Sequence, residues 1–394
     1  MDDPKWQAMI LKEFNVLLKG VFQLPIYFPA GTRHFKAVKA AEVIRKELVK
    51  VIETKREMKS SHGKVEKDLI SHLMNARDEN GNLLKDKEIA DNVILLMDSG
   101  HDTSSSTMMM LMKYLAETPN CYQRVLEEQR EIISQKKPGE LLNKNDIQKM
   151  KYSSSVVNEV FRLSPPLLGT FRKAKVDFTY NGFSIPKDWT VWWITRSTHN
   201  DPQYFPNPEK FDPERFDRDA ITPHSFVPFG GGPRMCPGKE FARVEILAFL
   251  HNLVKNFRWE LVFPDELISV DPMPTSPKGL PKWWPPSLKK LFGDSFFTAP
   301  YNEDIRTRKM IVAFLHQEVM EQLVERFDKT CKKCMECDWI GNNKVLAFSL
   351  IKKCAFYIAC DMFASMDDSN WQAMMVKEFN ILVKGVFRLQ IYFP

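Results

Sequence analysis

Residues 229–238 read Phe-Gly-Gly-Gly-Pro-Arg-Met-Cys-Pro-Gly. The informative positions of this stretch have the spacing F-x-x-G-x-R-x-C-x-G. Glycine lets the backbone turn tightly and approach a flat ligand closely. Cys236 comes just before an apolar segment that we expect to be helical, and the N–H groups and dipole of a helix N-terminus stabilise a thiolate. The stretch therefore predicts a loop that presents a thiolate to a metal-centred ligand.

The other side chains of this cysteine loop suit the same task. Arg234 can hold a carboxylate by charge-assisted hydrogen bonds, and Phe229 can pack beside the sulfur and keep it dry. Together with Gly232 and Gly238, the loop is similar to the cysteine loop of the cytochromes P450. The resemblance implies that Cys236 is the axial ligand of the iron of haem b and that Arg234 binds a haem propionate. The alternative interpretation is a buried cysteine in a glycine-rich turn.

A charged pair and a later arginine belong to the same resemblance. Glu159 and Arg162 are three positions apart, so they share one face of a predicted helix and can pair. Taken alone, such a pair is typical of an exposed helix surface. The stretch Phe-Asp-Pro-Glu-Arg-Phe at 211–216 resembles a second P450 element, and this implies that Arg215 joins Glu159 and Arg162 in a charged triad. Such a triad positions the cysteine loop more than it stabilises the fold, because buried charges cost desolvation.

The segment Ser-Gly-His-Asp-Thr-Ser, which begins at Ser99, places residues of low helix propensity inside a long helical pattern. Serine and threonine hydroxyls can bond back to helix carbonyls and open the helix locally. The segment resembles the oxygen-binding groove of the cytochromes P450, although Ser99 stands where that family has alanine or glycine. The resemblance implies room for dioxygen at Gly100 and proton delivery by Asp102 and Thr103, a general-acid task. A polar stripe on a surface helix is the alternative, and His101 is interpreted as an ordinary helix residue.

Three longer stretches, residues 171–189, 229–261 and 271–281, resemble the plant P450 group that oxidises triterpenes. The family resemblance as a whole covers residues 1–281. It implies a monooxygenase that transfers one oxygen atom of O2 to an apolar, triterpene-like substrate. The electrons would come from NADPH through NADPH–cytochrome P450 reductase, at the endoplasmic reticulum membrane. Four residues that follow the E-x-x-R helix fall where the family lines its substrate pocket: Leu167, Leu168, Gly169 and Thr170.

The composition is that of a globular protein with a large core. Hydrophobic residues make up 44% and charged residues 27% of the 394, so the chain can enclose a ligand of the size of haem. A net charge of +6 is too small and too scattered to indicate a nucleic-acid partner. Seven cysteines, an odd number, favour reduced thiols over a disulfide framework. The chain has neither a signal-peptide pattern nor an apolar run that could span a membrane, so we expect no anchor of its own.

Hydrophobic periodicity predicts a mainly α fold with a small β portion. Short strands are expected within 168–196, with a turn at Asn181-Gly182. Residues 60–85 have the composition of a polar connection with a turn at Asn80-Gly81, and residues 200–237 that of a long proline-rich loop. The predicted helices cover residues 34–57, 86–117, 145–163 and 238–257.

One long repeat joins the two ends of the sequence. Residues 1–29 and 366–394 align without gaps and match at 21 of 29 positions, so the chain begins and ends with the same piece of a parent domain. Residues 282–394 resemble the first half of the same P450 group. The P450 fold is therefore expected to be incomplete and in permuted order, with a seam near residues 281–283, as a read-through of two tandem genes would produce. Neither portion contains a match to the N-terminal membrane anchor, the first helix or the first strands of the parent P450 domain.

This arrangement leaves three interpretations open. Residues 282–394 can dock on residues 1–281 as a permuted domain and supply Arg308, which the resemblance places on a haem propionate. Alternatively, the chain is a non-catalytic fusion or a pseudoenzyme fragment. The third interpretation is an iron–sulfur protein, since Cys331, Cys334 and Cys337 have a C-x-x-C-x-x-C spacing. The fourth cysteine of the bacterial pattern is missing, which favours free thiols on an amphipathic helix.

Overall fold

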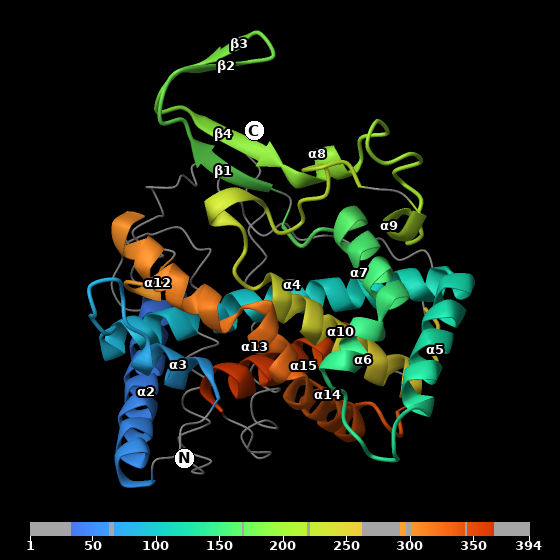
Figure 1. Cartoon of the computed structure of the whole chain (residues 1–394), viewed down its shortest axis with the longest axis horizontal. Helices are drawn as coiled ribbons and strands as arrows, with labels where there is room; N and C mark the ends of the chain where they lie inside the picture. Colours follow the sequence, from blue (N-terminus) through green and yellow to red (C-terminus); the bar gives the residue numbers. More distant parts are fainter. Residues whose placement is uncertain are drawn as a thin grey trace. The chain divides into compact units, whose positions relative to one another are not determined.

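The computed structural model describes residues 33–62, 67–167, 169–218, 221–261, 292–296, 301–342 and 345–365. These residues are mostly helical, with two small antiparallel sheets of two strands each (Figure 1). The prediction of a mainly α fold with a small β portion is confirmed. Among the described helices, none is both long enough and apolar enough to cross a bilayer. The terminal repeat, the seam near 281–283 and Leu168 lie outside the described residues.

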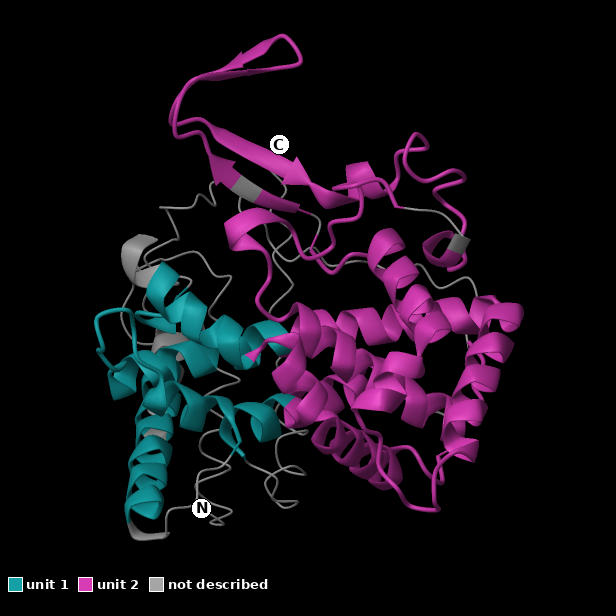
Figure 2. Cartoon of the chain, in the orientation of Figure 1, with its two compact units in different colours: residues 1–100, 276–314, 359–394 teal, residues 101–275, 315–358 magenta. Residues whose placement is uncertain are grey.

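The chain divides into two compact units, and each combines residues from both sides of the predicted seam (Figure 2). Unit 1 consists of residues 1–100, 276–314 and 359–394, and unit 2 of residues 101–275 and 315–358. Two helices, α4 (Asp86–Glu117) and α15 (Ala347–Ala364), contribute to both units. The predicted boundary at residue 281 concerns the origin of the two segments, and it stays a prediction.

Unit 1 contains α2 (Arg33–His62), α3 (Leu69–Asn75), the first half of α4 and α12 (Tyr301–Phe314). Helix α3 lies in the region that the sequence suggests is a polar connection. Asp68 caps it by accepting a hydrogen bond from the N–H of Ser71 at 2.7 Å, and Leu69, Ile70 and Leu73 are fully buried. The helix escapes prediction because seven residues are too few to establish a period. The predicted turn beside it is present, since Gly81 has a φ of 82°.

The centre of unit 2 is α10 (Lys239–Asn256), the helix that follows the cysteine loop. It packs against α5 (Pro119–Ser134), α6 (Lys144–Lys149), α7 (Lys151–Leu163), α13 (Gln317–Gln322) and α14 (Val324–Asp338). Every side chain from Val244 to Val254 is buried. A helix that is buried on all faces belongs to the core, so the apolar helix predicted here is confirmed.

The helix predicted over 145–163 is divided in the structure, because the chain leaves helical geometry at Met150. Glu128 of α5 explains the break. Its carboxylate accepts hydrogen bonds from the backbone N–H groups of Tyr152 and Ser153, at 2.7 and 2.9 Å. These N–H groups belong to the first turn of α7 and lack intrahelical partners. A side chain that is distant in the sequence therefore caps α7. No local sequence pattern predicts this cap.

The β portion consists of two hairpins in unit 2. Strand β1 (Gly169–Lys173) pairs with β4 (Thr190–Ile194), and β2 (Phe178–Tyr180) pairs with β3 (Phe183–Ile185). The turn between β2 and β3 has positive φ at Asn181 and Gly182, as a tight hairpin turn requires. Both the strands and this turn are as predicted. The short segments α8 (Thr195–His199), α9 (Arg215–Arg218) and the 3-10 turn η1 (Gly232–Arg234) complete the connection to α10.

Helices from beyond the predicted seam cover one side of α10 within unit 2. Phe327 of α14 meets Phe241 of α10 edge to face, with ring centroids 5.3 Å apart. The buried carboxylate of Asp328 accepts hydrogen bonds from the N–H of Leu142 at 2.9 Å and from the amide of Asn252 at 2.6 Å. These contacts combine apolar packing with satisfied buried polar groups, as in the interior of one domain.

Candidate functional site

The cysteine loop leads directly into the N-terminus of α10. Cys236 is exposed, and its N–H donates a hydrogen bond to the carbonyl of Phe229 at 2.8 Å, which closes the loop. Gly230 and Gly232 have φ values of 75° and 68°, in the left-handed region that glycine adopts without strain. Gly238 lies between Cys236 and the first residue of α10, so the sulfur is carried at a helix N-terminus as predicted.

Phe229 anchors the loop on α7. Its ring meets the ring of Phe161 edge to face, with centroids 4.9 Å apart. Phe161 is itself buried and stands between Glu159 and Arg162 in the sequence. The helix that carries the charged pair therefore also contacts the loop that carries Cys236.

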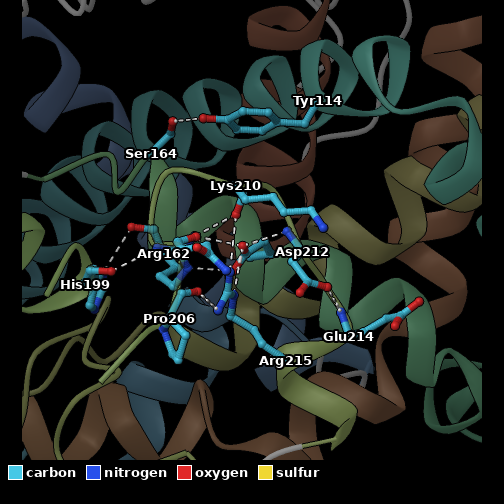
Figure 3. Close-up of polar contacts among 11 residues, drawn as sticks. Tyr114, Arg162, Ser164, His199, Pro206, Lys210, Asp212, Glu214 and Arg215 are labelled. Carbon is cyan, nitrogen blue, oxygen red and sulfur yellow. Dashed lines mark hydrogen bonds and ion pairs between the residues drawn. The ribbon is translucent and has the colours of Figure 1, made fainter. Parts of the chain in front are cut away.

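Glu159, Arg162 and Arg215 come together in the interior of unit 2. Figure 3 shows the two arginines and their polar contacts. Arg162 donates two hydrogen bonds to Glu159, from Nε at 2.7 Å and from Nη2 at 2.8 Å. Nε of Arg215 donates to Oε1 of Glu159 at 3.1 Å. The predicted three residues thus form one buried cluster, in which the paired geometry of Arg162 is the strong bidentate form.

The two arginines of this cluster also bind the chain between α8 and α9. Both guanidinium groups donate to the carbonyl of Lys210, Arg162 at 3.2 Å and Arg215 at 3.3 Å. Arg215 also donates to the carbonyl of Pro206 at 3.2 Å. A long loop without regular structure needs such partners for its backbone groups, so the triad orders the segment that precedes the cysteine loop.

His199 is a site residue that the sequence analysis missed. It is fully buried, its Nδ1 lies 3.2 Å from the carbonyl oxygen of Arg162, and its Nε2 accepts a hydrogen bond from the N–H of Val227 at 3.1 Å. Burial lowers the pKa of His199 to about 4. No local pattern could have revealed it, since its partners lie 37 and 28 residues away.

Arg172 of β1 is a second missed residue. Partial burial and the positive charge of Arg234 both lower its pKa, so the charges of two guanidinium groups from separate elements act on each other. Two such cations suit anionic groups. An exposed thiol on a glycine-rich loop and paired cations for two carboxylates fit haem, whose iron takes a thiolate and whose propionates are anionic.

Asp102 and Thr103 lie within α4, which continues as a helix through the predicted groove. The hydroxyls of Ser105 and Thr107 bond back to the carbonyls of His101 and Thr103, at 2.5 and 3.1 Å. The Asp102 carboxylate lies 3.0 Å from Nδ1 of His101 and 2.7 Å from Nζ of Lys352, on α15. Burial opposes ionisation of Asp102, but His101 and Lys352 outweigh it and lower its pKa.

The residues expected to line a substrate pocket are only partly described. Leu167 is 44% exposed. Gly169 approaches β4 so closely that a Cβ atom would lie 2.1 Å from the carbonyl of Trp193. Thr170 accepts a hydrogen bond from Arg172 at 2.9 Å. Arg308 belongs to unit 1, where its guanidinium lies over the ring of Phe296 at 5.8 Å.

The three cysteines of the C-x-x-C-x-x-C run do not share one environment. Cys331 and Cys334 are buried and Cys337 is exposed. The side chains of Cys331 and Cys334 contact Cys354 of α15 instead. Within the described ranges, no cluster of three or more His, Cys, Asp or Glu side chains is arranged to hold a metal ion. The iron–sulfur interpretation is therefore not favoured.

Comparison with known proteins agrees with this geometry. Residues 2–278 match the sequence model of the family described as Cytochrome P450. The chain belongs to the cytochrome P450 family. The cysteine loop, the triad and α4 all lie inside the matched range.

Plant proteins are among its relatives. The chain is 52% identical over 283 residues to Cytochrome P450 716A75 of Maesa lanceolata, and 51% identical over 282 residues to a beta-amyrin 28-monooxygenase of Vitis vinifera. Each alignment covers 71% of this chain and 58% of the relative. The chain thus spans less than two thirds of the length of the P450 relatives that it matches.

A solved P450 structure shares the fold. The retinoic acid bound cyanobacterial CYP120A1 is 36% identical, with a TM-score of 0.56, over 64% of this chain and 56% of that one. This likeness supports the P450 architecture of the matched part.

Proposed function

We propose that the chain is a haem-thiolate monooxygenase that oxidises an apolar, triterpene-like substrate. The observation that carries the proposal is the position of Cys236, exposed at the N-terminus of α10 on a loop that Phe229 and His199 fasten to the triad helix. Haem bound at Cys236 would supply oxygen activation, because thiolate ligation favours O–O cleavage.

Each of the other site residues has a task in this proposal. Arg234 and Arg172 bind the propionates, and Arg308 is a further propionate ligand by resemblance. Glu159, Arg162 and Arg215 hold the polypeptide that carries the loop. Asp102 and Thr103 deliver protons at the oxygen-binding stretch of α4. Leu167, Leu168, Gly169 and Thr170 line the substrate pocket.

The substrate class follows from the relatives. Several of them are named as beta-amyrin 28-monooxygenases, so a pentacyclic triterpene such as β-amyrin is the first substrate to test. Electrons would come from NADPH through NADPH–cytochrome P450 reductase at the endoplasmic reticulum membrane. The chain is incubated with reductase, NADPH and β-amyrin. Mass spectrometry should then detect a product whose mass exceeds that of β-amyrin by one oxygen atom.

The decisive experiment measures how the haem is ligated and requires no substrate turnover. The full chain is expressed with haem, reduced and exposed to carbon monoxide, and we expect the red-shifted Soret band of a thiolate-ligated haem. Cys236→Ala should abolish this band, whereas Cys337→Ala, which removes another exposed thiol, should leave it intact. Absence of the band in the unmodified chain would support the alternative, a non-catalytic fusion of two P450 fragments.

A further inference from the structure

Lys352 contacts the carboxylate that the proposed function uses for proton delivery. Its Nζ lies 2.7 Å from Oδ1 of Asp102, and its side chain is only 6% exposed. The lysine comes from α15, in the segment beyond the predicted seam, whereas Asp102 belongs to α4. Both residues are part of unit 2.

The contact belongs to a larger junction between α4 and α15. The ring of His101 meets Phe356 edge to face, with centroids 5.7 Å apart. Phe356 is four residues after Lys352, so both lie on one face of α15. Nζ of Lys352 also lies 4.9 Å from the centre of the Phe348 ring, which restricts where the ammonium group can go. The lysine is thus held in place from its own helix.

His101 and Lys352 are the titratable groups that contact the Asp102 carboxylate among the described residues. Burial lowers the pKa of His101, so the imidazole beside the carboxylate favours its neutral form. The lysine is therefore the group that balances the charge of Asp102. Removing it would leave the Asp102 carboxylate, which is 27% exposed, without its cation, and this disfavours the ionised form.

We infer that Lys352 is a positioning residue for Asp102, so that the segment beyond the seam completes the proton-delivery site on α4. This inference rests on the proposed function, in which Asp102 delivers protons. Lys352 fixes both the direction in which the carboxylate points and its protonation state. A chain that lacked α15 would keep Cys236, the triad and Asp102 but would lack the group that orients Asp102.

The test compares two neighbouring lysines of the full chain. Lys352→Met removes the contact with Asp102. Lys353→Met is the matched control, since Lys353 pairs with Asp338 of α14 at 2.6 Å and loses the same charge from the same helix. The ionisation of Asp102 is followed by carbon-13 NMR of labelled aspartate carboxyls, and the signal is assigned by its loss in Asp102→Asn. This readout requires neither haem nor turnover.

We expect the Asp102 carboxyl to titrate about one pH unit or more higher in Lys352→Met than in the unmodified chain, as loss of a close cation produces. The titration of the Asp102 carboxyl should be unchanged in Lys353→Met. With haem and reductase, Lys352→Met should lower kcat about tenfold with little change in KM and alter the pH profile, because general-acid steps contribute factors of this size or larger. Lys352→Arg should restore most of the rate.

Identical titration of Asp102 in Lys352→Met and in the unmodified chain would overturn the inference. The carbon monoxide band separates this failure from failure of the proposed function, because it reports Cys236 ligation and should persist in both lysine variants. If Lys352→Met does not fold, Lys352→Gln gives the same comparison, since its amide is polar but carries no charge.

Discussion

The imidazole of His199 links the backbone of Arg162 to the backbone of Val227, two residues before Phe229. A carbonyl faces one ring nitrogen and an N–H faces the other. Only the neutral tautomer with its proton on Nδ1 satisfies both partners. The position of the cysteine loop is therefore coupled to one protonation state of one buried side chain.

This coupling predicts a pH-dependent stability. The pKa of His199 is about 4 in the fold and 6.5 in an unfolded chain. Between these values the unfolded chain binds more protons, so the free energy of unfolding falls as the pH falls from about 6.5 to about 4, by about 1.4 kcal/mol per pH unit. Above about pH 6.5 the contribution of His199 is constant.

Denaturant unfolding at several pH values measures the effect. His199→Asn keeps a polar group at the position of Nδ1 but cannot titrate, so its stability should depend less on pH over this range. His224→Asn is the control, because His224 is exposed and should leave the slope unchanged. Equal slopes for His199→Asn and the unmodified chain would contradict the assignment of the neutral tautomer.

The burial of the triad predicts that substituting one of its arginines lowers the unfolding free energy far more than substituting an exposed arginine. Arg162→Met leaves the Glu159 carboxylate buried with fewer partners, and breaking a buried pair in this way costs about 3–5 kcal/mol of unfolding free energy. Arg124→Met removes a cation from an exposed pair with Glu214 and should cost less than about 1 kcal/mol. Thermal or denaturant unfolding compares the two. Similar losses in both variants would mean that the triad is not buried in solution.

Substitution of two adjacent glycines in the cysteine loop distinguishes the stability cost of backbone strain from that of side-chain packing. Space for a Cβ atom is open at both Gly231 and Gly232, with no heavy atom within 4 Å. Gly232 has a φ of 68° and Gly231 a φ of −150°. Gly232→Ala should therefore cost about 1–2 kcal/mol, whereas Gly231→Ala should be nearly neutral. The midpoint of denaturant unfolding checks both, and a larger loss in Gly231→Ala would show that the loop has another conformation.

The sequence contains the features that depend on local spacing. Helix α10, the hairpin turn at Asn181-Gly182 and the Glu159–Arg162 pair can be found because period, turn chemistry and motif spacing are properties of neighbouring residues. Arg215 could be added to this pair only through the family resemblance. The break at Met150 cannot be found in this way, because Glu128 causes it from another helix. The sequence does not predict the roles of His199, Arg172 and Lys352, for the same reason. Their roles depend on partners that only the tertiary fold brings within reach.

The cysteines should differ sharply in reactivity. Cys236 and Cys337 are exposed, while four others are buried: Cys331, Cys334, Cys354 and Cys360. Burial raises the pKa of Cys360, and contact with Cys354 together with burial raises that of Cys334. Since the thiolate is the reactive form, a thiol reagent should label Cys236 and Cys337 in the native haem-free chain and reach the four buried cysteines only on unfolding. Mass spectrometry of the labelled peptides identifies them, and rapid native labelling of Cys331 or Cys334 would contradict the packing of α14 on α15.

The segment beyond the seam can be tested as a part of the fold through Asp328. Asp328→Ala leaves the N–H of Leu142 and the amide of Asn252 buried without this acceptor, which should lower the free energy of unfolding by on the order of 3 kcal/mol. Glu325→Ala changes an exposed carboxylate one turn earlier on the same helix and should have little effect. Denaturant unfolding measures the difference, and limited proteolysis should cut Asp328→Ala within 301–365 sooner than Glu325→Ala. If the two variants are equally stable, α14 does not dock on α10 in solution, and the chain is a fusion whose second segment contributes nothing to the P450 core.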